Sequence, residues 1–318
     1  MGVADQEAIE QFRALMDQLD EPLKNTFQNM HQGCPSEALE RFLKAREWNV
    51  VKAHKMLVDC LQWRIQNEID NILAKPIIPA DLYRAIRDSQ LVGLSGCTKE
   101  MHYYVQSHIQ MNEYRDRVIF PAATRKYGRN ISTCVKVLDM TGLKLSALNQ
   151  IKLLTDISTI DDLNYPKKTQ TYYIVNAPYV FSACWKVVKP LLRERTRRKI
   201  QVLQGCGRDE LLKIMDYTSL PHFFRKEGSV SCHHIGNVTT DNCFSLDHDF
   251  HRLVYNYIQQ QAALLEAVSP IKQGSVMGIP VPDPEDANVA KTIKSRFQKF
   301  GGLTGLSNSL NGLEVNGR

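Results

Sequence analysis

Strand-like apolar runs alternate with helix-like segments between residues 133 and 216, and this alternation constrains the fold more than any other feature of the chain. We expect strands at 133–140, 172–176 and 200–204, each followed by a helix, at 146–160, 181–192 and 209–216. The strand segments are nearly unbroken apolar runs, which is typical of strands that are covered on both faces. Strands that alternate with helices predict an α/β layered fold with a mostly parallel sheet and right-handed crossovers.

The first third of the chain predicts helices only. Apolar residues recur at three- and four-residue steps over 6–30, Ser36 is a candidate N-cap, and a further helix follows the corner at Trp48-Asn49. Past this region we expect a long amphipathic helix over Tyr103–Tyr127.

Three parts follow from this pattern: a helical amino-terminal module (1–75), an α/β domain (76–228) and a C-terminal extension (229–318). In the extension we expect one helix over Phe250–Leu265, with the Asn-, Gly- and Ser-rich end disordered.

Charge and apolar runs narrow the class of protein. The 40 basic and 34 acidic side chains leave a net charge of +6, which argues against bulk nucleic-acid binding and is compatible with an anionic membrane surface. The longest apolar stretch, Tyr172–Trp185, is shorter than the roughly 20 residues of a membrane span. Acidic residues at the start argue against a signal peptide, and the eight cysteines contain no C-x-x-C pair. We therefore expect a cytoplasmic protein with reduced thiols.

Two motifs suggest other chemistry, and we interpret both as structural. Gly205-Cys206-Gly207-Arg208 lies where a dinucleotide loop would, but Glu210 occupies the position of the third glycine, so a tight turn is the better interpretation. Cys232-His233-His234 with His248 and His251 matches no standard zinc spacing, so we expect surface histidines and no metal site.

The segment Arg193–Lys199 holds five cations in seven residues and follows the unusually apolar helix 181–192. The charge run is compatible with a solvated helix end, with a nuclear-import or nucleic-acid patch, or with a site for an anionic headgroup. The helix is compatible with a buried core helix or with a lid that covers a pocket and meets a bilayer when it opens.

Three segments, in order, resemble the CRAL-TRIO lipid-transfer family, in particular the secretory phosphatidylinositol/phosphatidylcholine transfer proteins and their plant-like relatives. They are Glu40–Val50, Val137–Leu143, and Tyr172–Ser182 together with Lys189-Pro190-Leu191-Leu192. The resemblance covers roughly residues 36–228. It implies a lipid pocket between sheet and helices, closed by a gate helix.

The resemblance also implies a function and a site. One phospholipid, phosphatidylinositol foremost and phosphatidylcholine second, would be carried between membranes or presented to a phosphoinositide kinase in support of signalling and vesicle trafficking. The protein would be a monomer without enzymatic activity or a cofactor, peripheral on Golgi membranes, other endomembranes or the plasma membrane. Arg46, Thr196 and Lys199 match the family's headgroup positions. The gate would consist of Phe181, Trp185, Val188, Leu191 and Leu192.

The chain departs from the family pattern at several positions. Lys167 stands where relatives have an acidic residue, Glu47 stands where they often have a base, and Cys134 and Lys136 replace a hydroxyl pair used for phosphatidylcholine. A segment with a G-x-P-V strand is missing between Glu100 and Met101, which would leave the sheet one strand short. Two alternatives stay open: a cytosolic α/β enzyme that binds a nucleotide at Gly205–Arg208, and a binder of another hydrophobic ligand.

Overall fold

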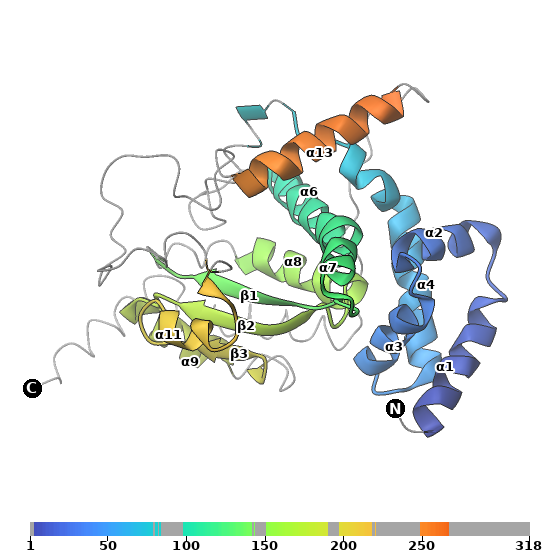
Figure 1. The fold of residues 1–318 in the computed structure, drawn as a ribbon, viewed down its shortest axis with the longest axis horizontal. Helices are drawn as coiled ribbons and strands as arrows, with labels where there is room; N and C mark the ends of the chain where they lie inside the picture. Colours follow the sequence, from blue (N-terminus) through green and yellow to red (C-terminus); the bar gives the residue numbers. More distant parts are fainter. Residues whose placement is uncertain are drawn as a thin grey trace, which may run out of the picture.

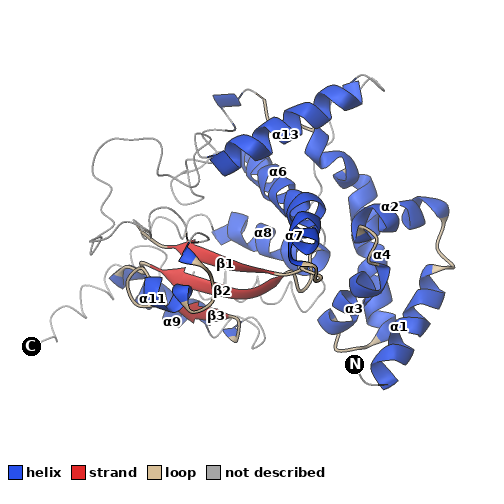
Figure 2. Ribbon diagram, viewed as in Figure 1, coloured by secondary structure: helices blue, strands red, loops and turns tan. Residues whose placement is uncertain are grey.

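A computed structural model of the 318-residue chain describes residues 3–78, 80–81, 83, 98–141, 143, 151–189, 197–217, 220 and 249–266. A helical body at the amino end lies beside a layered body of helices and a parallel sheet (Figures 1 and 2). The α/β fold class with a helical amino-terminal module is confirmed. No helix in the described ranges is long and apolar enough to cross a membrane.

Four helices form the amino-terminal body: α1 (Val3–Met16), α2 (Glu21–His31), α3 (Pro35–Ala45) and α4 (Val50–Gln66). Their facing sides share one apolar core. That core includes Ile9, Phe12, Leu39, Phe42, Leu43, Met56, Leu57 and Leu61. The apolar spacing in the sequence therefore predicts the buried sides of these helices correctly.

Two predictions about helix ends in this body are wrong. The apolar run over 6–30 is split into two helices, because the Asp20 carboxylate accepts a hydrogen bond from the Leu23 N–H at 3.1 Å and begins α2 there. Ser36 is not the N-cap of α3. That helix begins at Pro35, whose ring is suited to a first turn, and Cys34 is the capping position.

A second group of helices covers the sheet. The short helix η1 (Ile69–Ala74) leads toward α6 (Thr98–Tyr114), which continues through the π-helical turn η2 (Arg115–Ile119) into α7 (Phe120–Tyr127). The helix expected over Tyr103–Tyr127 is present but begins at Thr98 and contains the π turn. A π turn takes up an extra residue and rotates the side chains that follow it.

The described sheet has three parallel strands in the order β1 (Cys134–Asp139), β2 (Thr169–Val175) and β3 (Ile200–Val202). Lys136 pairs with Tyr172, and Tyr172 pairs with Ile200. The crossover helices are α8 (Ile151–Asn164) and α9 (Tyr179–Val188), and α11 (Arg208–Leu212) follows β3. Tyr173 and Val175 pack against Leu211 of α11, so the neighbouring side chain of Tyr172 belongs to the other face.

The expectation that every strand is covered on both faces is wrong for β3, where Val202 is 45% exposed, and for β1. Val135 and Leu138 are each 38% exposed. Among the described residues β1 pairs with β2 only, so it forms the edge of the sheet. A further strand could form over Leu91–Leu94, a short apolar segment interrupted by Gly93, but this segment lies outside the described residues.

The C-terminal helix expected over Phe250–Leu265 is present as α13 (Asp249–Glu266). It lies across α6 in Figure 1 and also contacts η1. Val254 and Ile258 are buried in the same core as Ile72 of η1 and Ile109 of α6. This part of the C-terminal extension therefore contributes to the main core.

Candidate functional site

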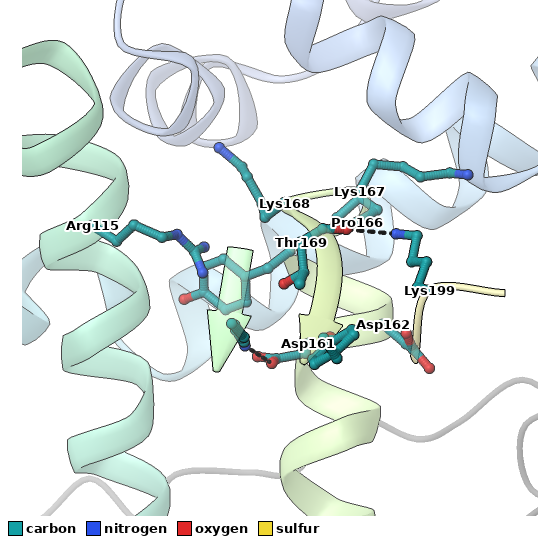
Figure 3. A pocket seen from close by; sticks show the side chains of 11 residues that line it. Arg115, Asp161, Asp162, Pro166, Lys167, Lys168, Thr169 and Lys199 are labelled. Carbon is teal, nitrogen blue, oxygen red and sulfur yellow. Dashed lines mark hydrogen bonds and ion pairs between the residues drawn. The ribbon is translucent and has the colours of Figure 1, made fainter. Parts of the chain in front are cut away.

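A hollow lies at the amino end of the sheet, where β2 and β3 begin (Figure 3). Its lining contains five basic side chains and two carboxylates. The lining residues are Arg115, Lys136, Asp161, Asp162, Tyr165, Pro166, Lys167, Lys168, Thr169, Tyr172 and Lys199. A hollow with this excess of cations is suited to an anionic ligand such as a phosphodiester.

Lys199 is the residue among the sequence-predicted headgroup positions that the structure places in this hollow. It comes directly before β3, and its carbonyl accepts the Tyr172 N–H at 2.8 Å, which fixes its backbone against β2. Its Nζ donates to the Thr169 carbonyl at 2.7 Å (Figure 3). The β2–β3 pairing therefore holds this cation at the hollow.

Of the other two headgroup candidates, Arg46 does not line the hollow and Thr196 is not described. Arg46 is half-buried at the C-cap of α3, where its Nη1 donates to the Ala45 carbonyl at 3.5 Å, and it is not among the residues that line the hollow. Thr196 lies outside the described residues. The prediction of a joint site of Arg46, Thr196 and Lys199 stays a prediction.

Two departures from the family pattern, Lys136 and Lys167, both line the hollow. Lys136 forms an ion pair with Asp161 at 3.3 Å, and its ammonium lies over the Tyr172 ring, 5.7 Å from the centroid. Asp161 also accepts from the Asn112 amide at 2.7 Å and lies 2.7 Å from His108 Nε2. Burial opposes the charge on Asp161, but His108 and Lys136 hold the pKa of this carboxyl well below its usual range.

Behind the hollow lies a buried ionic cluster centred on Glu113 of α6, whose side chain is 3% exposed. Arg64 of α4 donates to both carboxylate oxygens, at 2.7 and 3.0 Å, Arg117 lies at 2.7 Å, and the Tyr165 hydroxyl donates at 2.7 Å. Burial alone would raise the pKa of Glu113, but the two arginines and these bonds lower it to about 2. The cluster joins the amino-terminal body to the edge of the hollow.

A second ionic contact holds the same edge. Lys168 lies 2.9 Å from Asp116 of η2, and Arg115 donates to the same carboxylate at 2.8 Å. Burial lowers the pKa of the Lys168 ammonium. Sequence reasoning missed both ionic clusters, because each joins residues from distant segments and no local motif marks them.

The apolar helix expected over 181–192 is present from Tyr179 to Val188 as α9, and its role as a gate stays a prediction. The rings of Phe181 and Trp185 are stacked, 5.8 Å apart at 15°. Phe181 is buried, Trp185 is half-buried, and Tyr179, which the sequence analysis did not select, is 66% exposed. The side chain of Val188 and residues Leu191 and Leu192 lie outside the described part of the structure.

Of the two motifs with other candidate chemistry, the structure describes in full only the glycine motif at Gly205–Arg208. Gly205 and Gly207 have φ of +57° and +66°, and a Cβ at Gly207 would lie 2.6 Å from Leu203 Cδ1, so both glycines serve a tight turn. Within the described ranges no group of three His, Cys, Asp or Glu side chains is placed to hold a metal ion. The described residues include four free thiols, those of Cys34, Cys60, Cys134 and Cys206. The motif of Cys232-His233-His234 with His248 and His251 lies mostly outside the described residues.

Comparison with known proteins gives two family matches. The CRAL/TRIO domain model matches residues 100–225, and the CRAL/TRIO N-terminal domain model matches residues 8–59. The crystal structure of Sfh5 superimposes with a TM-score of 0.52 at 15% identity, over 80% of this chain and 98% of that one. That likeness shows a shared fold.

Curated relatives include two groups of proteins. SEC14 cytosolic factor of Eremothecium gossypii is 30% identical over 214 residues, which are 61% of this chain and 70% of the relative. Phosphatidylinositol/phosphatidylcholine transfer protein SFH12 of Arabidopsis thaliana is 29% identical over 249 residues, which are 71% of this chain. The match spans less than half of that relative, 44% of its length.

Proposed function

Because the chain belongs to the CRAL-TRIO family, we propose that it binds a phospholipid, phosphatidylinositol first, and transfers it between membranes. The observation that carries this proposal is the position of Lys199 in a hollow whose charged lining, five basic side chains and two carboxylates, has an excess of cations. A phosphodiester bears a negative charge and several acceptor oxygens, which ammonium and guanidinium groups bind well. Relatives named as phosphatidylinositol/phosphatidylcholine transfer proteins support the same activity.

The hollow favours an inositol headgroup over a choline headgroup. An inositol ring offers hydroxyl groups that both the cations and the carboxylates of the lining can bind. Choline carries a quaternary ammonium, which the ammonium groups of Lys136 and Lys199 would repel. Phosphatidylcholine is therefore the weaker ligand in this proposal.

Transfer requires contact with a membrane, and α9 is the element we assign to it. Its exposed Tyr179 and half-buried Trp185 are amphipathic rings, which prefer the boundary between headgroups and acyl chains. In this proposal the protein works as a non-enzymatic carrier in the cytoplasm, peripheral on Golgi or other endomembranes. It would deliver phosphatidylinositol to a phosphoinositide kinase.

The test is native mass spectrometry of the purified full chain, followed by transfer of labelled lipid between vesicles. We expect a copurified glycerophospholipid, with phosphatidylinositol transferred faster than phosphatidylcholine. A copurified nucleotide would favour the enzyme alternative, and a different apolar ligand would favour a CRAL-TRIO binder of another class. Absence of phospholipid binding and transfer would contradict the proposal.

A further inference from the structure

The segment Tyr165–Thr169, which we call the hollow turn, connects α8 to β2 and is bonded at both of its ends. At one end the Tyr165 hydroxyl donates to Glu113 Oε1 at 2.7 Å. At the other end the Thr169 carbonyl accepts from Lys199 Nζ at 2.7 Å (Figure 3). The hollow turn therefore lies between a buried carboxylate and the candidate headgroup cation.

Glu113 is a fixed anchor for this turn. Arg64 binds both of its oxygens and Arg117 binds one, and all three side chains come from helices. Arg64 is itself held by Asp70, with its Nη2 2.7 Å from Oδ1, and is 1% exposed. A carboxylate held in this way has one orientation, so the Tyr165 hydroxyl meets an acceptor that does not move.

The middle of the hollow turn has a second anchor. Lys168 pairs with Asp116, and Arg115 holds Asp116 from the same π turn. The π turn places the neighbouring Arg117 against Glu113 while Asp116 meets Lys168. Single π turns inside α-helices occur often at functional sites because they re-aim side chains in this manner.

We infer that Glu113 and Tyr165 are positioning residues of the headgroup site, which act through the hollow turn to hold Lys199 in place. The Tyr165 hydroxyl is bonded to Glu113 and not to Lys199. Tyr165 would therefore affect a ligand through the hollow turn, whose Thr169 carbonyl holds the Lys199 ammonium. The ligand named in this inference rests on the proposed function, whereas the positioning of Lys199 does not. Loss of the Tyr165 hydroxyl should loosen the turn and with it the Lys199 ammonium.

A lipid-independent measurement tests the positioning directly. Acetylation of lysines in the full chain is followed residue by residue with mass spectrometry. We expect Tyr165→Phe to raise the acetylation rate of Lys199 at least about threefold, because the loss of one hydrogen bond loosens the turn that holds the Lys199 ammonium. Asp116→Asn, which removes the second anchor, should act in the same direction. The exposed Lys52 serves as an internal standard, because its acetylation rate should be the same in every variant.

The matched control is Tyr173→Phe. Tyr173 is also buried, but it packs against Leu211 on the opposite face of β2. Its substitution removes the same hydroxyl and should leave the acetylation rate of Lys199 unchanged. Equal rates at Lys199 in the wild type, Tyr165→Phe and Asp116→Asn would overturn the inference, as would an equal rise in the control.

A double-mutant cycle then connects positioning to ligand binding. Transfer is measured from phosphatidylcholine vesicles that contain phosphatidylinositol. We expect Tyr165→Phe to slow phosphatidylinositol transfer about three- to tenfold in the wild type and to have no further effect in Lys199→Ala. Equal losses in both backgrounds would show that Tyr165 does not act through Lys199. Absence of transfer by the wild type would contradict the proposed function, and the acetylation rates would still decide the positioning.

Discussion

At the level of single residues, the headgroup chemistry depends most directly on Lys199. A charge-assisted bond from its ammonium to a phosphate contributes about 1.5–3 kcal/mol. We therefore expect Lys199→Ala to lower phosphatidylinositol transfer more than about tenfold while the melting temperature stays nearly unchanged. Lys52→Ala removes an exposed lysine of α4 and serves as the control. Unchanged transfer in Lys199→Ala would remove this residue from the site.

The pKa of Glu113 leads to a prediction about how the stability of the fold depends on pH. Its pKa falls from 4.5 to about 2 in the folded protein, so the folded state favours the ionised carboxylate. The associated stability is fully present above about pH 4.5 and is lost as the pH falls toward 2, with a magnitude on the order of 3 kcal/mol. Denaturant unfolding between pH 6 and pH 3 measures it. We expect Glu113→Gln to be less stable at pH 6 and to lose less stability on acidification, and equal slopes would contradict this.

Sequence reasoning reached Lys199 but not Glu113 or Tyr165, and the reason is physical. Lys199 is the last residue of a basic run that precedes a strand, and the family resemblance matches it to a headgroup position. The bonds of Glu113 reach 49 and 52 residues along the chain, to Arg64 and Tyr165. Such a cluster forms only when separate helices pack together, so no local spacing predicts it.

At the level of elements, periodicity predicted which segments form helices and strands better than where they end. The run over 6–30 kept its helical period through Asp20, where a side-chain cap and Pro22 begin a new helix. The π turn within 103–127 also escaped detection, because the apolar spacing continues across it. How far the side chains of β1 are buried depends on the segments that lie beside this strand. The amino-acid composition of a strand does not determine its neighbours, so the apolar run of β1 did not predict its exposure.

In α9 we expect substitutions of the two stacked rings, Phe181 and Trp185, to have different effects. Trp185→Glu should weaken association with anionic vesicles and slow lipid exchange, because a charge replaces an interfacial ring. Its effect on the melting temperature should be small, since Trp185 is only half-buried. Phe181→Ala should instead lower stability, because Phe181 is 8% exposed. Vesicle cosedimentation and thermal unfolding separate the two, and an unfolded Trp185→Glu variant would favour a core helix.

At the scale of the whole molecule, α13 belongs to the core although it lies near the C-terminal end of the described residues. Ile258 is 2% exposed against η1 and α6, whereas Leu253 on the same helix is 61% exposed. We expect Ile258→Ala to cost about 2–4 kcal/mol and several degrees of melting temperature. Leu253→Ala should have little effect. Similar melting temperatures for both variants would mean that α13 does not contribute to the stability of the core.

The open edge of β1 is the feature of the whole molecule with the largest consequence for lipid binding. Glu100 and Met101, between which the family pattern has an additional segment, are consecutive residues of α6, and the helix is continuous there. Among the described residues nothing pairs with the outer edge of β1, and Val135 and Leu138 stay partly exposed. Backbone groups that are shielded from water without partners cost about 1–3 kcal/mol each, which is large beside a net stability of about 5–15 kcal/mol.

Insertion of a segment with a G-x-P-V strand between Glu100 and Met101 tests this view of the sheet. The new strand would pair with β1 and cover its apolar side chains, at the cost of moving the start of α6. We expect the extended chain to melt at a higher temperature and to copurify with more phospholipid than the present chain. Both proteins are purified side by side, and thermal unfolding and lipid phosphorus per protein are measured. Equal melting temperatures and equal lipid contents would show that β1 functions as an edge strand and that three strands suffice to hold the ligand.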